Sequence, residues 1–273
     1  MHLVCPRSHH ASGASQRTEV ALCFYGGRGP SQSRLDGDGY KQLALAFQVK
    51  HAFNGALGGG GALVGAWCVA LAHAHAAPAL IALGPTLIPV VFSGGIHLDG
   101  FADVVDAQSS CADQKRKREI LKDPHIGAFA AIGVAAYLVA LFAISSQIAF
   151  DARRGALLGL VYVVSRAATG FAVIAFPRSP EQGMLALEQD FASAASKPAL
   201  AALFAAAALA AVALSPIAGA LAIAASLALL IRTRRLAQKG FGGMSGDIAG
   251  FHLCRCELAC ITCIAFCQLA GVA

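Results

Sequence analysis

Residues 51–98, HAFNGALGGGGALVGAWCVALAHAHAAPALIALGPTLIPVVFSGGIHL, contain no Asp, Glu, Lys or Arg. A membrane-spanning helix needs about 20 mostly apolar residues, so this stretch is long enough for two. The same four residue types are absent from 124–150 and 198–231, which hold one and two further spans. Because lipid offers the backbone no hydrogen bonds, these segments must be helices.

Two more apolar segments, 155–176 and about 248–271, bring the prediction to about seven spans in an all-α, polytopic helical membrane protein. The composition agrees, since 57% of the 273 residues are hydrophobic, only 13% are charged, and the mean hydropathy is +0.63. A soluble domain carries about a quarter charged residues. The ordinary soluble class is therefore excluded.

Basic residues are distributed unevenly between the two sides of this topology. With the N-terminus in the cytoplasm, seventeen Lys and Arg fall in the cytoplasmic segments, which are 1–54, 99–125, 177–198 and 232–247. The opposite connections hold only Arg153 and Arg154. Cytoplasmic loops of membrane proteins carry such an excess. We therefore expect a multi-pass protein of the cytoplasmic (inner) membrane with its polar motifs facing the cytoplasm.

The net charge of +6 follows from this topology and favours anionic lipid. The lipid bilayer is thus an expected partner, and nucleic acid is not, because no basic patch is interleaved with aromatic residues. Residues 1–45 are polar and lack the apolar core of a signal peptide. We expect a poorly ordered cytoplasmic segment there, followed by a single integral-membrane helical domain, residues 46–273, that carries the catalytic motifs.

Small residues inside the spans predict close helix packing. Gly55/Gly59 and Gly61/Gly65 have the small-xxx-small spacing that lets helices approach. In the last span, one helical stripe carries Cys256, Cys260, Cys263 and Cys267. Four ligands strung along one helix cannot surround a metal ion tetrahedrally, so we interpret the stripe as packing.

The stretch HLDGFADVVDAQ, residues 97–108, directly follows the first apolar block and contains three carboxylates. On a helix Asp99, Asp103 and Asp106 lie within about 40° of one another. Carboxylates so placed repel each other unless a cation lies between them. Because hard oxygen ligands suit Mg²⁺, the spacing predicts a divalent-cation site.

Two structural interpretations compete with the cation site. The acids could be helix N-caps and first-turn acids, although capping can use one aspartate, such as Asp99, and not all three. Alternatively, the acids could form a solvated face paired with the basic run 115–118. The apolar residues between the acids, Phe101, Val104 and Val105 among them, argue against that second alternative.

More polar features fall on the same predicted side. LKDPHIG (121–127) carries Lys122, Asp123 and His125, and Arg166 lies within a span, where a charge is costly and indicates function. GGMSGDIAG (242–250) offers a glycine turn whose amides could approach a phosphate, with Asp247 as a further metal ligand or a helix N-cap. Glu257 lies inside the last predicted span. A salt bridge with the nearby Arg255 explains its presence there as well as a functional role does. Carboxylates, bases and a glycine turn at a membrane surface fit phosphoryl transfer.

Five segments in this order resemble the cobalamin synthase (adenosylcobinamide-GDP ribazoletransferase) family: SGGIHLDGFADVVDA (93–107), REILKDPHIGAFA (118–130), VSRAATG (164–170), EQGM (181–184) and GGMSGDIAG (242–250). The resemblance implies an integral-membrane enzyme that joins adenosylcobinamide-GDP to α-ribazole, or to its 5′-phosphate, and releases GMP with Mg²⁺ as cofactor. The corrinoid nucleotide and α-ribazole are then its substrates. A homo-oligomeric state stays open.

The resemblance also assigns roles to individual residues. It implies Mg²⁺ binding by Asp99, Asp103, Asp106 and Asp247, and proton acceptance by one of the aspartates or by His97. Lys122 and Arg166 would hold the diphosphate. The further residues expected to bind substrate are Asp123, Gly243, Gly246 and Glu257.

Other functions stay possible from the sequence. A CDP-alcohol phosphotransferase or a prenyltransferase would also use aspartates and Mg²⁺ on a diphosphate, but the aspartate spacing fits neither well. A transporter should place acids in the middle of spans in both halves of the chain, whereas these acids lie at predicted span ends.

Overall fold

The computed structural model describes residues 60–179 and 195–272, all of them within the compact unit Tyr40–Ala273. The predicted N-terminal segment 1–45, the Gly55/Gly59 pair and the motif EQGM (181–184) lie outside the described residues. The elements in chain order are α3 (Gly60–His73), α4 (Pro78–Phe92), α5 (Ile96–Ser109), α6 (Gln114–Ile120), α7 (Ala128–Ser145), α8 (Ala152–Ala175), α10 (Ser196–Leu214), α11 (Pro216–Leu236), the π-helix η2 (Ala237–Phe241) and α12 (Gly246–Leu269).

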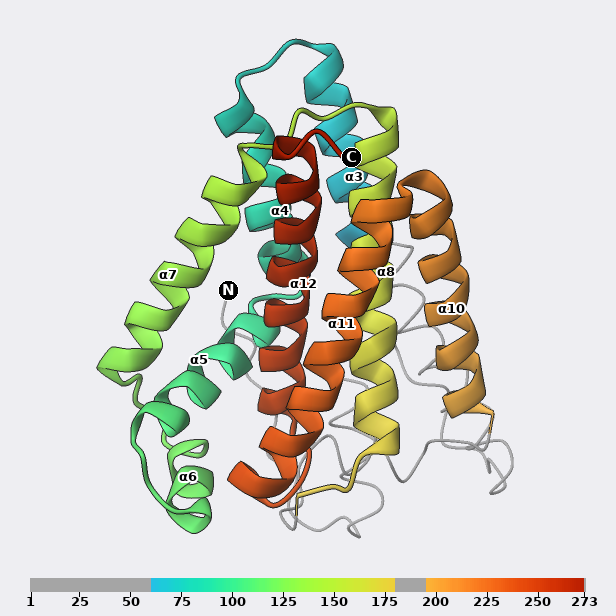
Figure 1. Cartoon of the computed structure of the whole chain (residues 1–273). Helices are drawn as coiled ribbons and strands as arrows, with labels where there is room; N and C mark the ends of the chain where they lie inside the picture. The colour runs from blue at the N-terminus through green and yellow to red at the C-terminus, as the bar shows by residue number, and fades with distance from the viewer. Residues whose placement is uncertain (1–59, 180–194, 273) are drawn as a thin grey trace, which may run out of the picture. The chain divides into compact units, whose positions relative to one another are not determined.

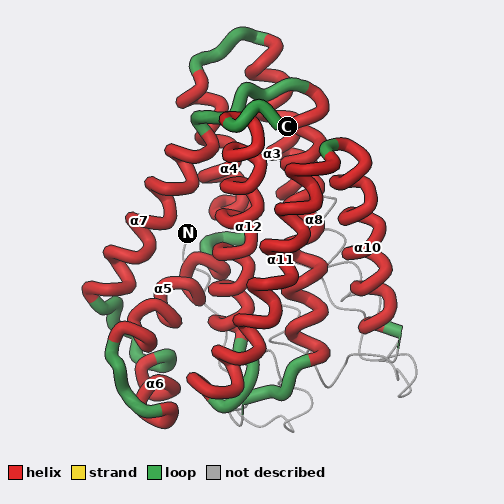
Figure 2. Tube along the Cα trace, viewed as in Figure 1, coloured by secondary structure: helices red, strands yellow, loops and turns green. Residues whose placement is uncertain are grey.

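The all-α membrane class predicted from the sequence is confirmed. The described residues form helices and loops with one isolated β-bridge, and five of these helices are long and apolar enough to cross a membrane (Figure 2). A sixth span results if α4 and α5 are one bent element, and α3 is a shorter apolar helix. The prediction of about seven spans is therefore close, and the protein is a multi-pass membrane protein.

The long helices alternate in direction, so their connections gather at two ends of the bundle (Figure 1). The α3–α4 turn, the α7–α8 connection and the C-terminus lie at one end. At the other lie α6, the end of α8 and the turn between α11 and α12. The α6–α7 connection and the turn between α11 and α12, which carry two of the motifs, lie toward this second end, which we call the motif end; the α4–α5 bend lies between the two ends.

The second predicted span is not a straight helix ending at residue 98. Helix α4 ends at Phe92, and α5 leaves at an angle of 92°. The turn uses two successive left-handed residues, Gly94 with φ 63° and Gly95 with φ 83°, a conformation that glycine adopts without a steric penalty. Asp99, Asp103 and Asp106 therefore lie on the second arm of a bent element. The sequence instead predicts these three residues in a cytoplasmic connection.

Two prolines inside α4 leave two of its carbonyls free to accept hydrogen bonds from neighbouring helices. Proline has no N–H, so Pro85 and Pro89 each leave unpaired the carbonyl four residues earlier. The Ile81 carbonyl accepts a bond from Trp67 Nε1 in α3 at 3.1 Å. The carbonyl of Pro85 accepts one from the Tyr162 hydroxyl in α8 at 3.0 Å. In lipid these freed carbonyls need such partners, since water is absent.

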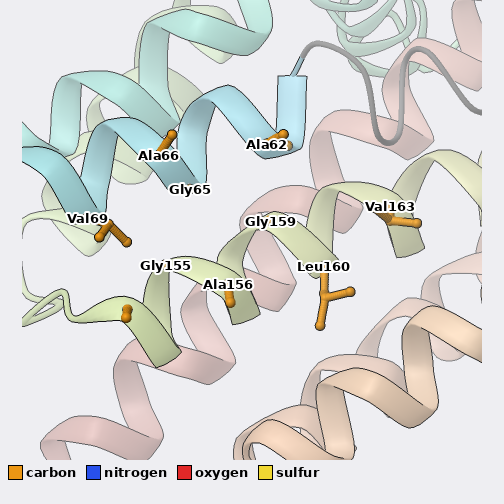
Figure 3. Close-up of a pocket in the computed structure, with 11 residues that line it drawn as sticks. Ala62, Gly65, Ala66, Val69, Gly155, Ala156, Gly159, Leu160 and Val163 are labelled. Carbon is orange, nitrogen blue, oxygen red and sulfur yellow. The ribbon is translucent and has the colours of Figure 1, made fainter.

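Helices α3 and α8 meet along small residues, as the glycine spacing predicts (Figure 3). A Cβ added at Gly65 would lie 2.9 Å from the carbonyl oxygen of Gly155, and one at Gly159 would lie 3.3 Å from that of Gly61. The two backbones are therefore nearly in contact. A shallow apolar groove runs along the same seam.

The cysteine stripe packs against α11, which confirms the packing interpretation. Cys256 donates its thiol hydrogen to Ser226 Oγ, and Cys260 donates to the carbonyl of Ala222, both at 3.3 Å. The Sγ atoms thus face a neighbouring helix, and all described cysteines are free thiols.

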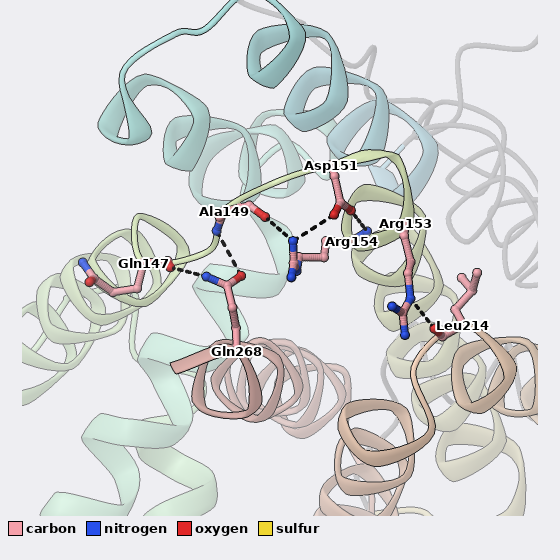
Figure 4. Close-up of polar contacts among 7 residues, drawn as sticks. All are labelled: Gln147, Ala149, Asp151, Arg153, Arg154, Leu214 and Gln268. Atoms are coloured by element: carbon pink, nitrogen blue, oxygen red, sulfur yellow. Dashed lines mark hydrogen bonds and ion pairs between the residues drawn. The ribbon is translucent and has the colours of Figure 1, made fainter. Parts of the chain in front are cut away.

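The two arginines at the end opposite the motif end have local partners (Figure 4). Arg154 pairs with Asp151 at 2.8 Å and donates to the carbonyl of Ala149, and Arg153 donates to the carbonyl of Leu214 at the end of α10. Their guanidinium groups therefore bind carbonyl and carboxylate oxygens at or near helix ends. They do not weaken the bias of basic residues toward the motif end.

Candidate functional site

The candidate site begins where α5 crosses α12. A Cβ at Gly100 would lie 2.7 Å from Asp247 Cα, and one at Gly250 would lie 2.7 Å from the carbonyl oxygen of His97. Only glycine at both positions permits so close an approach of two backbones. The crossing places the aspartate face of α5 beside the first turn of α12.

Four carboxylates lie near this crossing, within electrostatic range of one another's helix faces. Asp99, Asp103 and Asp106 share one face of α5, and Asp99, Asp106 and Asp247 all lie close enough to Asp103 to repel its charge. Asp99 is exposed and the other three are partly buried. We call these four residues the carboxylate cluster. The sequence spacing predicted three of its members on one face, and the fold adds the fourth from a helix about 140 residues away.

The α6–α7 connection closes one side of the cluster. Its Gly127 touches the carboxylate of Asp106 so closely that any side chain there would displace the acid. Helix α6 is anchored to the turn between α11 and α12, because Gln114 donates to the carbonyl of Gln238 at 3.0 Å and Arg118 donates to that of Phe241.

Within this connection, Asp123 accepts hydrogen bonds from the backbone N–H of His125 at 3.0 Å and from its Nδ1 at 2.7 Å. These bonds stabilise the carboxylate and hold the pKa of Asp123 below its usual value. Lys122 and Asp123 are both exposed at the motif end. They lie on the loop that closes the cluster.

A second polar site lies behind the bend between α4 and α5. Arg166 of α8 pairs with Glu257 of α12 at 2.7 Å, and their side chains are only 9% and 3% exposed. The alternative pairing of Glu257 with Arg255 is therefore wrong. His97 lines the same small cavity, which also includes Ser93, Tyr137 and Cys254.

His97 is separated from the carboxylate cluster by the body of α5. At 100° per residue, its side chain leaves the helix about 120–180° away from those of Asp103 and Asp106. The structure thus places the predicted site residues in two groups: the carboxylate cluster on one face of α5, and His97, Arg166 and Glu257 on the other.

The glycine turn between α11 and α12 packs against the chain segment that follows α8. Gly243 has φ 153° and its α-hydrogen side abuts the backbone of Arg178, while Met244 N donates to the carbonyl of Pro177 at 2.8 Å. Gly243 is thus explained by packing. Gly246 is the exposed first residue of α12, with nothing near its Cβ position.

The N-cap role is wrong for Asp99 and Asp247, but both are first-turn acids, as the same alternative predicted. Ser245 caps α12 by accepting a bond from Ile248 N at 3.3 Å, so Asp247 lies in the first turn. Gly95 is the N-cap of α5, and Asp99 follows in its first turn. Acids there still favour the helix dipole.

The predicted pairing of the acids with the basic run 115–118 also fails. Arg116 pairs with Glu119 at 2.9 Å, and Arg118 bonds Gln114 and the turn before α12. Between described residues, no ion pair joins this run to the aspartates of α5. The basic run therefore does not provide the pairing that this alternative predicted.

The donor set of the cluster fits magnesium, which prefers hard oxygen ligands. In residues 60–179 and 195–272 no three His, Cys, Asp or Glu side chains are already arranged around a single metal position. In phosphoryl-transfer sites, however, Mg²⁺ is commonly held by one or two carboxylates, with water and substrate phosphates completing its shell. The cluster fits that open kind of site, and it does not form a closed protein cage.

Sequence reasoning missed the residues that position the site. Gly100 and Gly250 fix the crossing, and Tyr137 and Cys254 line the cavity beside His97. The sequence contained a signal for the two glycines as positioning residues, because each lies about one helical turn from a charged or polar motif residue. Tyr137 lies in an apolar span with no such signal.

The chain is similar to known proteins over most of its length. A family model described as cobalamin-5-phosphate synthase matches residues 52–265. An adenosylcobinamide-GDP ribazoletransferase of Lachnoclostridium phytofermentans is 38% identical over 66% of this chain and 68% of its own. Proteins of the same name from Geobacillus kaustophilus and Azorhizobium caulinodans are each 30% identical, over 70% and 80% of this chain and 76% and 82% of theirs. No solved structure matches the chain.

Proposed function

The chain belongs to the cobalamin-5-phosphate synthase family, and on that premise we propose that it is an adenosylcobinamide-GDP ribazoletransferase, an enzyme of the final assembly of cobalamin. It joins adenosylcobinamide-GDP to α-ribazole, or to its 5′-phosphate. A ribazole hydroxyl forms a bond to the phosphorus that stays on the corrinoid, the bridging P–O bond of the diphosphate breaks, and GMP leaves with the bridging oxygen.

The observation that carries this proposal is the meeting of α5 and α12. Their crossing places Asp247 beside the α5 face that carries Asp99, Asp103 and Asp106, so that the other three acids all lie within electrostatic range of Asp103. Phosphoryl transfer depends mostly on positioning and on charge stabilisation, and a cluster of carboxylates is the usual protein contribution where Mg²⁺ is the cofactor.

We infer that the carboxylate cluster holds Mg²⁺. The bound ion would supply positive charge against the diphosphate oxygens. Asp103 is the central residue, because the negative charges of the other three acids all repel a negative charge on its carboxylate. Its like-charged surroundings are costly without a cation.

The protein's own residues would accept the proton and hold the diphosphate. A carboxylate of the cluster is the better proton acceptor, because His97 leaves α5 on the other side, toward Arg166. Lys122 is exposed on the adjacent loop. The first backbone N–H groups of α12, from Gly246 onward, are a favourable site for phosphate oxygens.

The other residues predicted to bind substrate have different structural roles. Asp123 shapes the loop that carries Lys122, through its bonds to His125. Gly243 would act by fixing the turn before α12. Arg166 and Glu257 are buried and paired, which favours a role in holding α5 over direct contact with the diphosphate.

We further propose that the motif end faces the cytoplasm and that the protein lies in the inner membrane. The excess of Lys and Arg at this end supports the orientation. GDP-activated substrates are cytoplasmic, so this orientation also gives them access.

The rival functions find no support in the fold. A transporter would place paired acids at mid-span in discontinuous helices of both halves. Here the buried mid-span acid, Glu257, is neutralised by Arg166, and the unpaired carboxylates gather at one end.

The test is a reconstituted reaction with purified protein in liposomes. We expect cobalamin, or its 5′-phosphate, to form from adenosylcobinamide-GDP and α-ribazole, or ribazole phosphate, only when Mg²⁺ is present. Asp103→Asn should abolish turnover. In EDTA this variant should be at least as heat-stable as the parent, because one of four repelling charges is gone, and Mg²⁺ should stabilise it less.

The matched control is Glu119→Gln, which removes an exposed carboxylate of α6 at the same end of the bundle. It should keep turnover and the full stabilisation by Mg²⁺. If Asp103→Asn turned over at the parental rate, the assignment of the cluster to catalysis would be wrong.

A further inference from the structure

Two arginines have no role in the site described so far: Arg255 lies inside a span, and Arg232 lies near the motif-end terminus of α11. Arg232 belongs to α11 and Arg255 to α12, and both helices are long and apolar enough to cross a membrane. Nine residues at 1.5 Å each place Arg255 about 14 Å along α12 from its first residue. A guanidinium at such a position is costly and normally has a partner or a function.

Neither arginine has an acidic partner within the part of the chain that the structure describes. The acids that form ion pairs there are bound elsewhere: Glu257 to Arg166, Asp151 to Arg154 and Glu119 to Arg116. The hydrogen bond between Thr233 Oγ1 and His252 Nδ1, 2.9 Å long, brings these turns of α11 and α12 together, and Arg232 lies close enough to Arg255 to repel its charge. Two neighbouring cations that have no acidic partner among the described residues are suited to bind an anion.

The position of Arg255 is fixed by aromatic contacts. Its guanidinium lies 4.9 Å from the ring centroid of Phe251, and that ring stacks on Phe101 of α5 at 5.6 Å. The side chain therefore points back one turn toward the start of α12, as helix side chains do. Because Asp247, Phe251 and Arg255 are spaced four residues apart, they share one side of the helix.

We propose that Arg232 and Arg255 together bind a phosphate group, on the membrane-embedded side of the carboxylate cluster. Guanidinium groups bind phosphate oxygens in pairs and are less strongly hydrated than an ammonium, which suits a partly buried site. The phosphate has two possible sources: the 5′-phosphate of a phosphorylated acceptor, which rests on the proposed function, or the headgroup of a membrane phospholipid.

The first experiment measures binding without any reaction. Detergent-purified protein is titrated with inorganic phosphate at constant ionic strength, and its heat stability is recorded. We expect Arg255→Gln and Arg232→Gln to weaken phosphate binding by about tenfold or more, the loss of one charge-assisted contact. Arg255→Lys should retain part of the affinity. Arg116→Gln removes the same charge from α6 and should leave the affinity unchanged.

The second experiment identifies the source. If the acceptor supplies the phosphate, the KM for ribazole 5′-phosphate rises in Arg255→Gln while that for α-ribazole does not. If a lipid supplies it, activity in liposomes loses its dependence on phosphatidylglycerol, equally with both acceptors. Unchanged phosphate affinity in both Gln variants overturns the proposal. Phosphate binding without cobalamin formation would instead leave this site standing and refute the proposed function.

Discussion

Breaking the ion pair between Arg166 and Glu257 is the sharpest test of how the bundle holds the candidate site. The pair joins α8 to α12 behind the bend that aims α5, and both side chains are almost completely buried. Glu257→Gln keeps the shape of the side chain and removes only its charge. Arg166 is then left in a largely apolar interior beside Tyr162, whose ring lies 5.4 Å away.

The expected loss of stability is about 3–5 kcal/mol, because removal of one partner leaves a buried charge uncompensated. Solvent screening does not reduce this figure much, since Arg166 is 9% and Glu257 3% exposed. For a chain of this size about 2–4 °C of Tm corresponds to each kcal/mol, so the midpoint should fall by roughly 6–20 °C. Heating in detergent followed by gel filtration measures it.

The double variant Arg166→Met with Glu257→Met separates stability from chemistry. Replacing a whole buried pair by apolar residues of similar volume is often neutral or stabilising, so the double variant should regain most of the lost stability. If the pair only holds α5 in place, turnover should recover as well. If Arg166 binds the diphosphate, turnover stays low in a stable protein.

The reasoning fails on one result in particular. A Glu257→Gln protein as stable as the parent would mean that the guanidinium is not held in a low-dielectric interior. Glu119→Gln, which breaks an exposed pair, is the control and should change stability by less than about 1 kcal/mol.

Three further predictions address the supports of the site. Gly100→Ala drives a Cβ into the backbone of α12, so it should lower both Tm and turnover, whereas Gly246→Ala, at an open position, should change the free energy of unfolding by less than about 1 kcal/mol. Trp67→Phe removes the donor to a carbonyl that proline leaves unpaired in α4 and should cost about 1–3 kcal/mol in the same heating assay. His125→Ala should raise the pKa of Asp123 toward its usual value, as NMR titration of labelled aspartate would show. Because the folded pKa is depressed, the stabilisation of this loop is present above the usual aspartate pKa and is lost as the pH falls through the depressed value.

Much of the fold could be predicted because its signals are local. Apolar blocks without charges are helices in lipid whatever they pack against, and the spans 155–176 and 248–271 correspond to α8 and α12. Spacings of three and four place side chains on one helical face, so the alignment of the three α5 aspartates and of the cysteine stripe followed from residue numbers alone.

Other features depend on contacts between segments far apart in the chain, and no local pattern contains them. The partner of Glu257 is Arg166, 91 residues away, and not the neighbouring Arg255, because residues two apart on a helix point in opposite directions. The sequence left Asp247 as either a further metal ligand or a helix cap; Ser245 takes the cap, and the crossing at Gly100 places Asp247 beside α5.

The sequence by itself therefore determined the membrane class, the helices and which acids share a face, since backbone hydrogen bonding in lipid and helical periodicity act within a segment. Only the tertiary structure decided that the α4–α5 element bends by 92°, that a fourth carboxylate joins the other three, and that His97 lies apart from them. These outcomes depend on how closely two backbones can approach, and that distance is set jointly by glycines on different helices.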